Sequence, residues 1–178
     1  MEIGTLFNLP AHPLIVHIPV IGIPLMVLAV IAYMVVPSKP TWLFWASGIL
    51  TTIVAIATVA AAGSGEQLEE MLPQADQGST LVSRHAALGE QTEFIVLAFA
   101  GVALAYLALD WWRRRRGTDA SGIQISRIHL RATSVNRLLT VLLAAAIIAG
   151  SAATVWDVRT GHAGAKSSWE DVVSSSGE

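Results

Sequence analysis

Four long stretches of hydrophobic residues, separated by polar connections, dominate the pattern of this chain. The stretches run over about residues 13–36, 41–62, 93–112 and 138–158, and none carries a charged residue near its middle. A helix needs about 20 mostly apolar residues to cross the hydrocarbon core of a bilayer. The pattern therefore predicts an all-α, polytopic membrane protein whose four transmembrane helices form a single domain over residues 1–178.

The connections between these stretches predict an up-and-down four-helix bundle. Only the segment Pro-Ser-Lys-Pro, residues 37–40, separates the first two helices, so they must form an antiparallel hairpin. Pro19 and Pro24 lie within the first helix. Because each proline removes a backbone donor, we expect the N-terminal half of this helix to bend. Glycine and alanine recur through the other three helices and predict close packing between them.

The composition agrees with a membrane protein and excludes several functions. Hydrophobic residues make up 53% of the chain and charged residues 13%, whereas a soluble domain carries about 25% charge. There is no cysteine, which excludes thiolate metal sites, iron–sulfur clusters and cysteine catalysis. A net charge of −2 gives no sign of nucleic-acid binding. Without a hydrolase, zinc-peptidase or P-loop motif, we expect an electron carrier or accessory subunit rather than an independent enzyme, and assign no catalytic residue.

Basic residues are distributed unequally between the two sides of the predicted bundle. Arg84, Arg159 and Lys166 lie on one side. The other side holds Lys39, Arg113, Arg114, Arg115, Arg116, Arg127, Arg131 and Arg137. Lysine and arginine favour the cytoplasmic side of a membrane. We therefore expect the arginine-rich connections in the cytoplasm, both termini outside it, and insertion into the lipid bilayer of a bacterial inner membrane.

Four of the five histidines fall on the predicted extracytoplasmic side. His12 and His17 lie at the start of the first helix, His85 precedes the third and His162 follows the fourth, whereas His129 lies among the arginines. Imidazole is a common ligand of transition metals and of haem iron. His12 and His17 are five residues apart, so they do not share one helical face and need not bind the same atom.

A b-type haem used for electron transfer is the leading hypothesis for these histidines. His17 and His85 are the expected axial pair, and His12 and His162 would form a second pair or bind the propionates. Glycines near the ligands would leave room for the macrocycle, and arginines would pair with the propionates. These further cofactor-binding residues are Gly22, Gly89, Arg84 and Arg159.

Two alternatives remain open. A zinc or copper site would use the same four histidines with a carboxylate such as Glu66, since both metals accept imidazole. In the other alternative the chain is a non-catalytic accessory subunit of a respiratory or envelope complex. Its histidines would then only hold loops together by hydrogen bonds.

The first helix begins with a motif that resembles a known family. His12, Pro13, Val16, His17 and Pro19 form the pattern HPxxVHxP. His85 before the third helix and the segment 159–165, Arg-Thr-Gly-His-Ala-Gly-Ala, follow in the same order. The chain thereby resembles, over about residues 9–169, the bacterial four-helix membrane domain called domain of unknown function 2231. Such domains sometimes occur beside Rieske-type or cytochrome c-type proteins, so the resemblance implies a redox or respiratory partner and ranks haem above a plain metal site.

Overall fold

Four helical segments of the structure are long and apolar enough to cross a membrane, and they overlap the four stretches that hydropathy predicts. The segments are Ala11–Val35, Thr41–Met71, Thr80–Arg115 and Val135–Trp169. This computed structural model describes the backbone of residues 5–6, 9–72, 79–119 and 125–175, and the side chains of residues 10–72, 79–115 and 135–169. The predicted all-α, four-helix membrane fold is confirmed.

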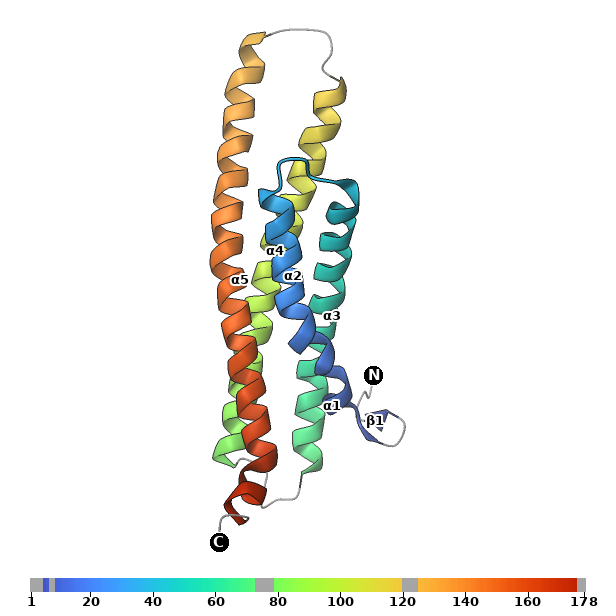
Figure 1. Ribbon diagram of the computed structural model, residues 1–178, viewed down its shortest axis with the longest axis vertical. Coiled ribbons are helices and arrows are strands. Elements are labelled where there is room, and N and C mark those ends of the chain that lie inside the picture. The colour runs from blue at the N-terminus through green and yellow to red at the C-terminus, as the bar shows by residue number, and fades with distance from the viewer. Residues whose placement is uncertain (1–4, 7–8, 73–78, 120–124, 176–178) are drawn as a thin grey trace.

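The helices run alternately up and down, as Figure 1 shows. A two-residue antiparallel strand pair precedes them, and the elements are β1 (Thr5–Leu6), β2 (Leu9–Pro10), α1 (Ala11–Ile15), α2 (His17–Val35), α3 (Thr41–Met71), α4 (Thr80–Asp119) and α5 (Ile125–Ser175). The turn between α2 and α3 lies at one end of the bundle, which we call the arginine end because it carries Lys39, Arg113 and Arg114. The opposite end, with α1, His85 and His162, we call the histidine end.

The predicted bend in the first helix is an interruption at Val16. This residue separates α1 from α2, although its own backbone stays in the right-handed helical region. Pro19 has no N–H to offer the carbonyl of Ile15, and its ring crowds that carbonyl, so the regular hydrogen-bond ladder cannot continue. Figure 1 shows α1 turned away from the direction of α2. This change of direction sets which side chains of α1 face the interior of the bundle.

Three helices extend beyond the predicted boundaries. The third and fourth hydrophobic stretches predict helices over 93–112 and 138–158, but α4 spans Thr80–Asp119 and α5 spans Ile125–Ser175. Likewise α3 continues past residue 62 to Met71. Hydropathy marks only the part of a helix that lipid surrounds, whereas packing against neighbouring helices stabilises helical backbone outside that part as well. Much of the expected extracytoplasmic loop between the second and third helices is therefore helical.

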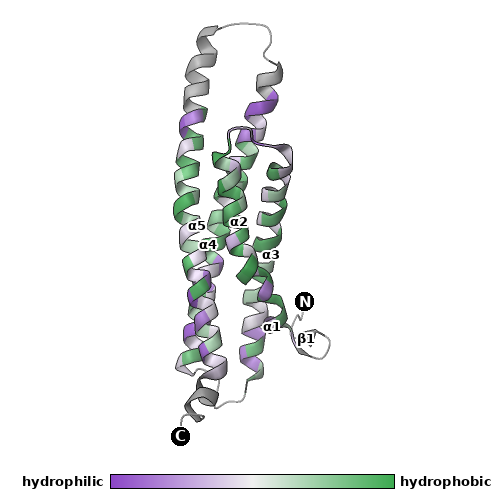
Figure 2. Cartoon of the chain, in the orientation of Figure 1, coloured by the Kyte–Doolittle hydropathy of each residue, from purple (hydrophilic) through white to green (hydrophobic). Residues whose placement is uncertain are grey.

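The interior of the bundle is closely packed, and its exterior is apolar. Tyr33, Phe99 and Val54 are among the fully buried side chains. Phe94 is 74% exposed and Ile148 is 72% exposed, as expected where lipid rather than water surrounds the helices. Figure 2 shows hydrophobic residues along the middle of the bundle and hydrophilic residues towards its ends. The histidine end is thus more polar than the middle of the bundle, whose apolar exterior suits a bilayer.

Candidate functional site

His12 and His85 meet inside the histidine end of the bundle. Their ring centroids lie 6.1 Å apart, with the ring planes inclined by 76°. His12 comes from α1 and His85 from the first turns of α4, so two segments more than seventy residues apart in sequence supply one imidazole each. Both side chains are half-buried. The predicted gathering of histidines at one end thus contains one close pair.

Each ring of this pair is held by a backbone carbonyl. His12 Nδ1 lies 2.9 Å from the carbonyl oxygen of Ala61, and His85 Nδ1 lies 3.1 Å from that of Thr160. A carbonyl oxygen only accepts, so Nδ1 must carry the proton and donate in both cases. In the neutral ring Nε2 then keeps its lone pair, and no hydrogen bond from the described residues reaches it. This tautomer is the one that metal-binding histidines commonly have.

A glycine lies against each of the two rings. A Cβ atom at Gly65 of α3 would lie 3.1 Å from Cε1 of His12, and one at Gly164 of α5 would lie 2.8 Å from Cε1 of His85. The second distance is shorter than any ordinary carbon–carbon contact. The ring of His85 therefore fits only because position 164 lacks a side chain, whereas a side chain at Gly65 would press on the ring of His12 and shift it slightly. Neither pairing is visible in the sequence, since Gly65 follows His12 by more than fifty residues.

Hydroxyl groups line the same interior region. Ser64 Oγ lies 3.3 Å from Nδ1 of His12. On the other side of the pair, Thr92 donates its proton to the carbonyl of Leu88 over 2.8 Å. The hydroxyl of Thr160 lies 2.7 Å from that of Thr92 and therefore donates to it. These contacts join α4 to α5 next to His85 and fix the carbonyl that orients its ring.

The sequence argument expected His17 to lie beside His85, but the structure does not place it there. His17 is exposed, and its Nδ1 lies 2.6 Å from the carbonyl oxygen of Pro13 in its own turn of the chain. A spacing of five residues turns a helical side chain by about 140°. His12 enters the bundle, so His17 points away from the interior. The juxtaposition that we expected for His17 belongs to His12.

Most of the remaining predicted site residues lie on the surface. His162, Arg84 and Glu66 are exposed. Arg159 is also exposed, and its guanidinium carbon lies 5.0 Å from the ring centroid of Trp156. His129 lies outside the residues whose side chains are described. No hydrogen bond or ion pair between described residues joins their side chains to the histidine pair.

The two predicted glycines have other surroundings. A Cβ atom at Gly22 would lie 2.6 Å from Cγ2 of Val54, so Gly22 permits the close approach of α2 and α3. A Cβ atom at Gly89 would have no neighbour within 4 Å. Within the part of the chain that was searched, no group of three or more histidine, aspartate or glutamate side chains could hold one metal ion. Among the predicted site residues, His12 and His85 are therefore the two whose imidazoles lie together near the bundle interior.

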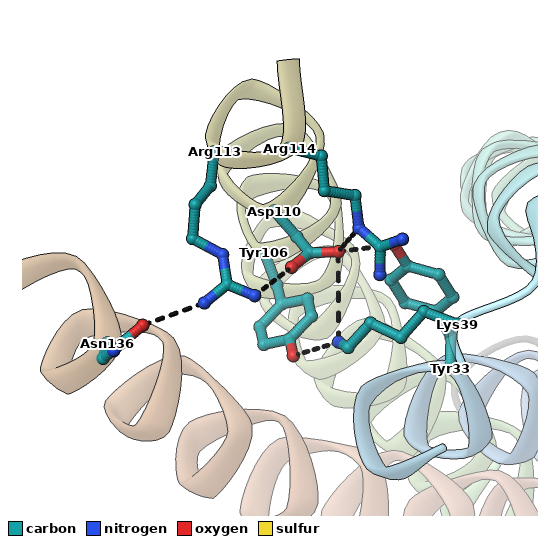
Figure 3. A network of polar contacts seen from close by, with 7 residues as sticks. All are labelled: Tyr33, Lys39, Tyr106, Asp110, Arg113, Arg114 and Asn136. Carbon is teal, nitrogen blue, oxygen red and sulfur yellow. Dashed lines mark hydrogen bonds and ion pairs between the residues drawn. The ribbon is translucent and has the colours of Figure 1, made fainter. Parts of the chain in front are cut away.

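A second polar cluster closes the arginine end, and the sequence argument missed it. Asp110 of α4 is fully buried and accepts hydrogen bonds from the hydroxyl of Tyr33 at 2.6 Å, from Arg114 at 2.8 Å and from Arg113 at 3.2 Å. Arg113 also donates to the side-chain oxygen of Asn136 on α5 at 2.9 Å. Figure 3 shows these side chains converging on the carboxylate. Every described contact of this carboxylate is with a donor or a cation, so the cluster acts as a clamp between helices.

Lys39 completes this clamp from the turn between α2 and α3. Its Nζ donates to the hydroxyl of Tyr106 at 2.7 Å and lies 4.0 Å from a carboxylate oxygen of Asp110. The same ammonium lies 4.7 Å from the ring centroids of both Tyr33 and Tyr106. Its backbone φ of 40° is in the left-handed region, which is unusual for a residue other than glycine. The contacts of its side chain offset that cost and hold the turn against the bundle.

The fold and the site define a multi-pass helical membrane protein with a half-buried histidine pair at one end and a buried carboxylate clamp at the other. The family described as predicted membrane protein DUF2231 matches residues 8–177. The chain belongs to this family, as the motif around His12 and His17 indicated. No curated protein and no solved structure matches the chain.

Proposed function

We propose that this protein binds a b-type haem between His12 and His85 and transfers electrons at the membrane surface. The observation that carries the proposal is the pair itself: two imidazoles from different helices, each with Nδ1 donating to a carbonyl and Nε2 left available. When bound, haem supplies one-electron redox chemistry. The protein would act as an electron carrier or as a subunit that passes electrons to a redox or respiratory partner.

The separation of the two rings suits coordination of one metal atom. Two imidazoles that bind one metal through nitrogen at about 2.0–2.1 Å have ring centroids roughly 5–6 Å apart. The observed 6.1 Å is close to this range, so His12 and His85 would be able to hold one iron atom between them. Gly65 and Gly164 leave the space that the two rings occupy.

The number of donors favours haem over zinc or copper. The porphyrin supplies four nitrogen ligands, so two histidines complete the coordination of its iron. A structural zinc site takes four protein ligands and a catalytic one takes three. The described residues gather no third histidine or carboxylate that could join this pair on one ion. We therefore place the zinc or copper reading second and treat it as an outcome of the test.

The same proposal assigns sides to the membrane. Lys39, Arg113 and Arg114 gather at the arginine end, and basic residues favour the cytoplasm. The histidine end, where α1 begins and α5 ends, then lies on the extracytoplasmic side of a bacterial inner membrane. A partner would exchange electrons with the haem from that side. Reaction of a membrane-impermeant reagent with a single cysteine introduced at exposed Glu66 of intact cells tests this orientation.

Absorption spectra of the detergent-purified protein test the haem directly. Protein expressed with ample haem should show a Soret band and sharp bands after reduction by dithionite. His12→Ala and His85→Ala should each remove most of the bound haem. His17→Ala and His162→Ala are matched controls that should retain it, since both side chains are exposed. A featureless spectrum, or loss of haem in the controls but not in the first two variants, would overturn the assignment, and metal analysis would then test zinc and copper.

A further inference from the structure

A groove on the outside of α5 lies at the arginine end of the bundle. Its volume is about 540 Å³, and the described residues that line it are Asn136, Arg137, Thr140 and Val141. This volume is in the range of sites that bind small molecules. All four side chains are exposed. The groove therefore opens to the surroundings of the bundle and is separate from the interior that holds the histidine pair.

The groove lies at the depth of a membrane interface. The side-chain oxygen of Asn136 accepts a hydrogen bond from Arg113 of α4 at 2.9 Å, so the groove is beside the clamp (Figure 3). Trp111, two residues before Arg113, is exposed on the same helix. Trp42 and Trp45 are exposed in the first turns of α3. Because tryptophan is enriched where the hydrocarbon meets the headgroups, the groove lies at the level of the lipid phosphates.

The described side chains at this end carry an excess of positive charge. Five of them are basic and one is acidic, namely Lys39, Arg113, Arg114, Arg115 and Arg137 against Asp110. The first three lie at most 4.0 Å from the carboxylate of Asp110. Arg137 differs, because no hydrogen bond or ion pair from the described residues reaches its guanidinium group. An anion is therefore the complement of this groove.

The contact with Arg113 also sets how Asn136 presents its amide. The oxygen accepts from Arg113, so the NH₂ group lies on the other side of the amide and keeps its protons for another acceptor. Thr140 gives its own hydroxyl proton to the carbonyl oxygen of Asn136 at 3.0 Å. The donors that remain for a ligand in the groove are the amide of Asn136 and the guanidinium of Arg137. Phosphate oxygens accept from both kinds of group.

An apolar strip continues from the groove along the lipid-facing side of α5. Val141, Ala144 and Ile148 follow Arg137 at spacings of four, seven and eleven residues, which place them on one face of the helix. All three are exposed. With a rise of 1.5 Å per residue, Ile148 lies about 16 Å along the axis from Arg137, close to the roughly 15 Å of hydrocarbon in one leaflet. Two donors above such a strip match a phosphate above an acyl chain.

We infer that this groove binds the headgroup of one anionic phospholipid, whose acyl chain lies along Val141, Ala144 and Ile148. A zwitterionic phospholipid carries the same phosphate, but its own cation offsets the negative charge that Arg137 attracts. Free phosphate lacks a chain to cover the apolar strip. Because Asn136 also accepts from Arg113, a bound lipid stabilises the contact between α4 and α5. The site is at the opposite end from the histidine pair, so the inference does not depend on haem.

Native mass spectrometry of the detergent-purified protein tests this inference. The protein is titrated with phosphatidylglycerol, which is anionic, and separately with zwitterionic phosphatidylcholine. One phosphatidylglycerol should remain bound under conditions that remove phosphatidylcholine. Arg137→Gln should weaken phosphatidylglycerol binding about fivefold, the effect of one basic residue at an anionic membrane surface. Arg84→Gln, which removes an exposed arginine at the histidine end, should leave binding unchanged.

A second variant keeps the inference testable if Arg137→Gln disturbs the fold. Asn136→Asp keeps an oxygen that accepts from Arg113 but replaces the NH₂ donor with an anion, so it should weaken phosphatidylglycerol binding at least as much. Equal retention of the two lipids would overturn the inference, as would equal losses in Arg137→Gln and Arg84→Gln. Displacement of the lipid by inorganic phosphate would show that the groove holds a free anion, and would overturn the lipid assignment.

Discussion

Replacement of Asp110 by asparagine removes one charge from the clamp at the arginine end and leaves its shape nearly unchanged. The carboxylate accepts from Tyr33, Arg113 and Arg114, and Lys39 approaches it to 4.0 Å. An asparagine keeps one accepting oxygen but turns an NH₂ group towards donors. At least one of these donors loses its acceptor, and the cations lose their counter-charge within the bundle. We expect a clear loss of stability.

The size of this loss follows from the burial of each contact. The bond from the Tyr33 hydroxyl to the fully buried carboxylate is of the charge-assisted kind that contributes about 1.5–3 kcal/mol. Arg113 and Arg114 are each 44% exposed, so solvent screening limits each of their ion pairs to roughly 0.5 kcal/mol. Together these contacts give about 3 kcal/mol for Asp110→Asn. This value is at the lower end of the roughly 3–5 kcal/mol that breaking a buried ion pair costs.

Unfolding in detergent micelles, followed by circular dichroism, measures this loss. Glu90→Gln is the control, because it makes the same chemical change at an exposed position of the same helix. Tyr33→Phe should lose about 1.5–2 kcal/mol, and the double variant should lose less than the two single losses added, because the residues share one bond. A loss below about 1 kcal/mol for Asp110→Asn would refute the reasoning, since the clamp would then contribute no more than a surface ion pair.

Two further predictions concern glycines. Gly164→Ala places a methyl group 2.8 Å from the ring of His85 and should lower haem occupancy. Gly161→Ala, which has open space around its Cβ, should retain the haem. Equal occupancy in the two variants would contradict the packing argument. Gly150→Ala places a methyl group 2.9 Å from a side chain of α2 and should destabilise the bundle by about 1–3 kcal/mol through overpacking. Gly101→Ala, which meets no atom within 4 Å, should be neutral or slightly stabilising in the same unfolding assay.

The number of helices and their alternating direction could be predicted because lipid imposes a strict requirement on sequence. A span must be apolar over about 20 residues, and the short turn at residues 37–40 leaves only an antiparallel arrangement. The helix ends could not be predicted in this way. At the end of α3 and the start of α4, polar residues such as Glu66 and Arg84 lie beyond the hydrophobic stretches, although the backbone remains helical. Hydropathy indicates which residues contact lipid, but it does not predict how far a helix extends beyond them.

The candidate site was predictable only in part. The sequence predicted that His12 and His85 lie at the same end of the bundle, because an even number of membrane-spanning helices separates them in the chain. It did not identify His12 as the partner of His85, since that choice depends on the rotation of α1 relative to the interruption at Val16. The contacts of Gly65 and Gly164 join positions far apart in the chain. The clamp escaped notice because Asp110 and its arginines read as ordinary charges at a membrane boundary.

The two buried aspartates allow one chemical change to be compared in opposite environments. Asp110 is surrounded by donors and cations, so its charge stabilises the fold, whereas no hydrogen bond or ion pair between described residues reaches the carboxyl group of Asp157. Asp157→Asn should therefore change the stability of the protein much less than Asp110→Asn does, by about 0.5 kcal/mol or below. The unfolding assay used for Asp110→Asn measures both variants under the same conditions. A loss at Asp157 equal to that at Asp110 would contradict this reasoning, because it would mean that the carboxyl group of Asp157 contributes a structural contact of the same strength.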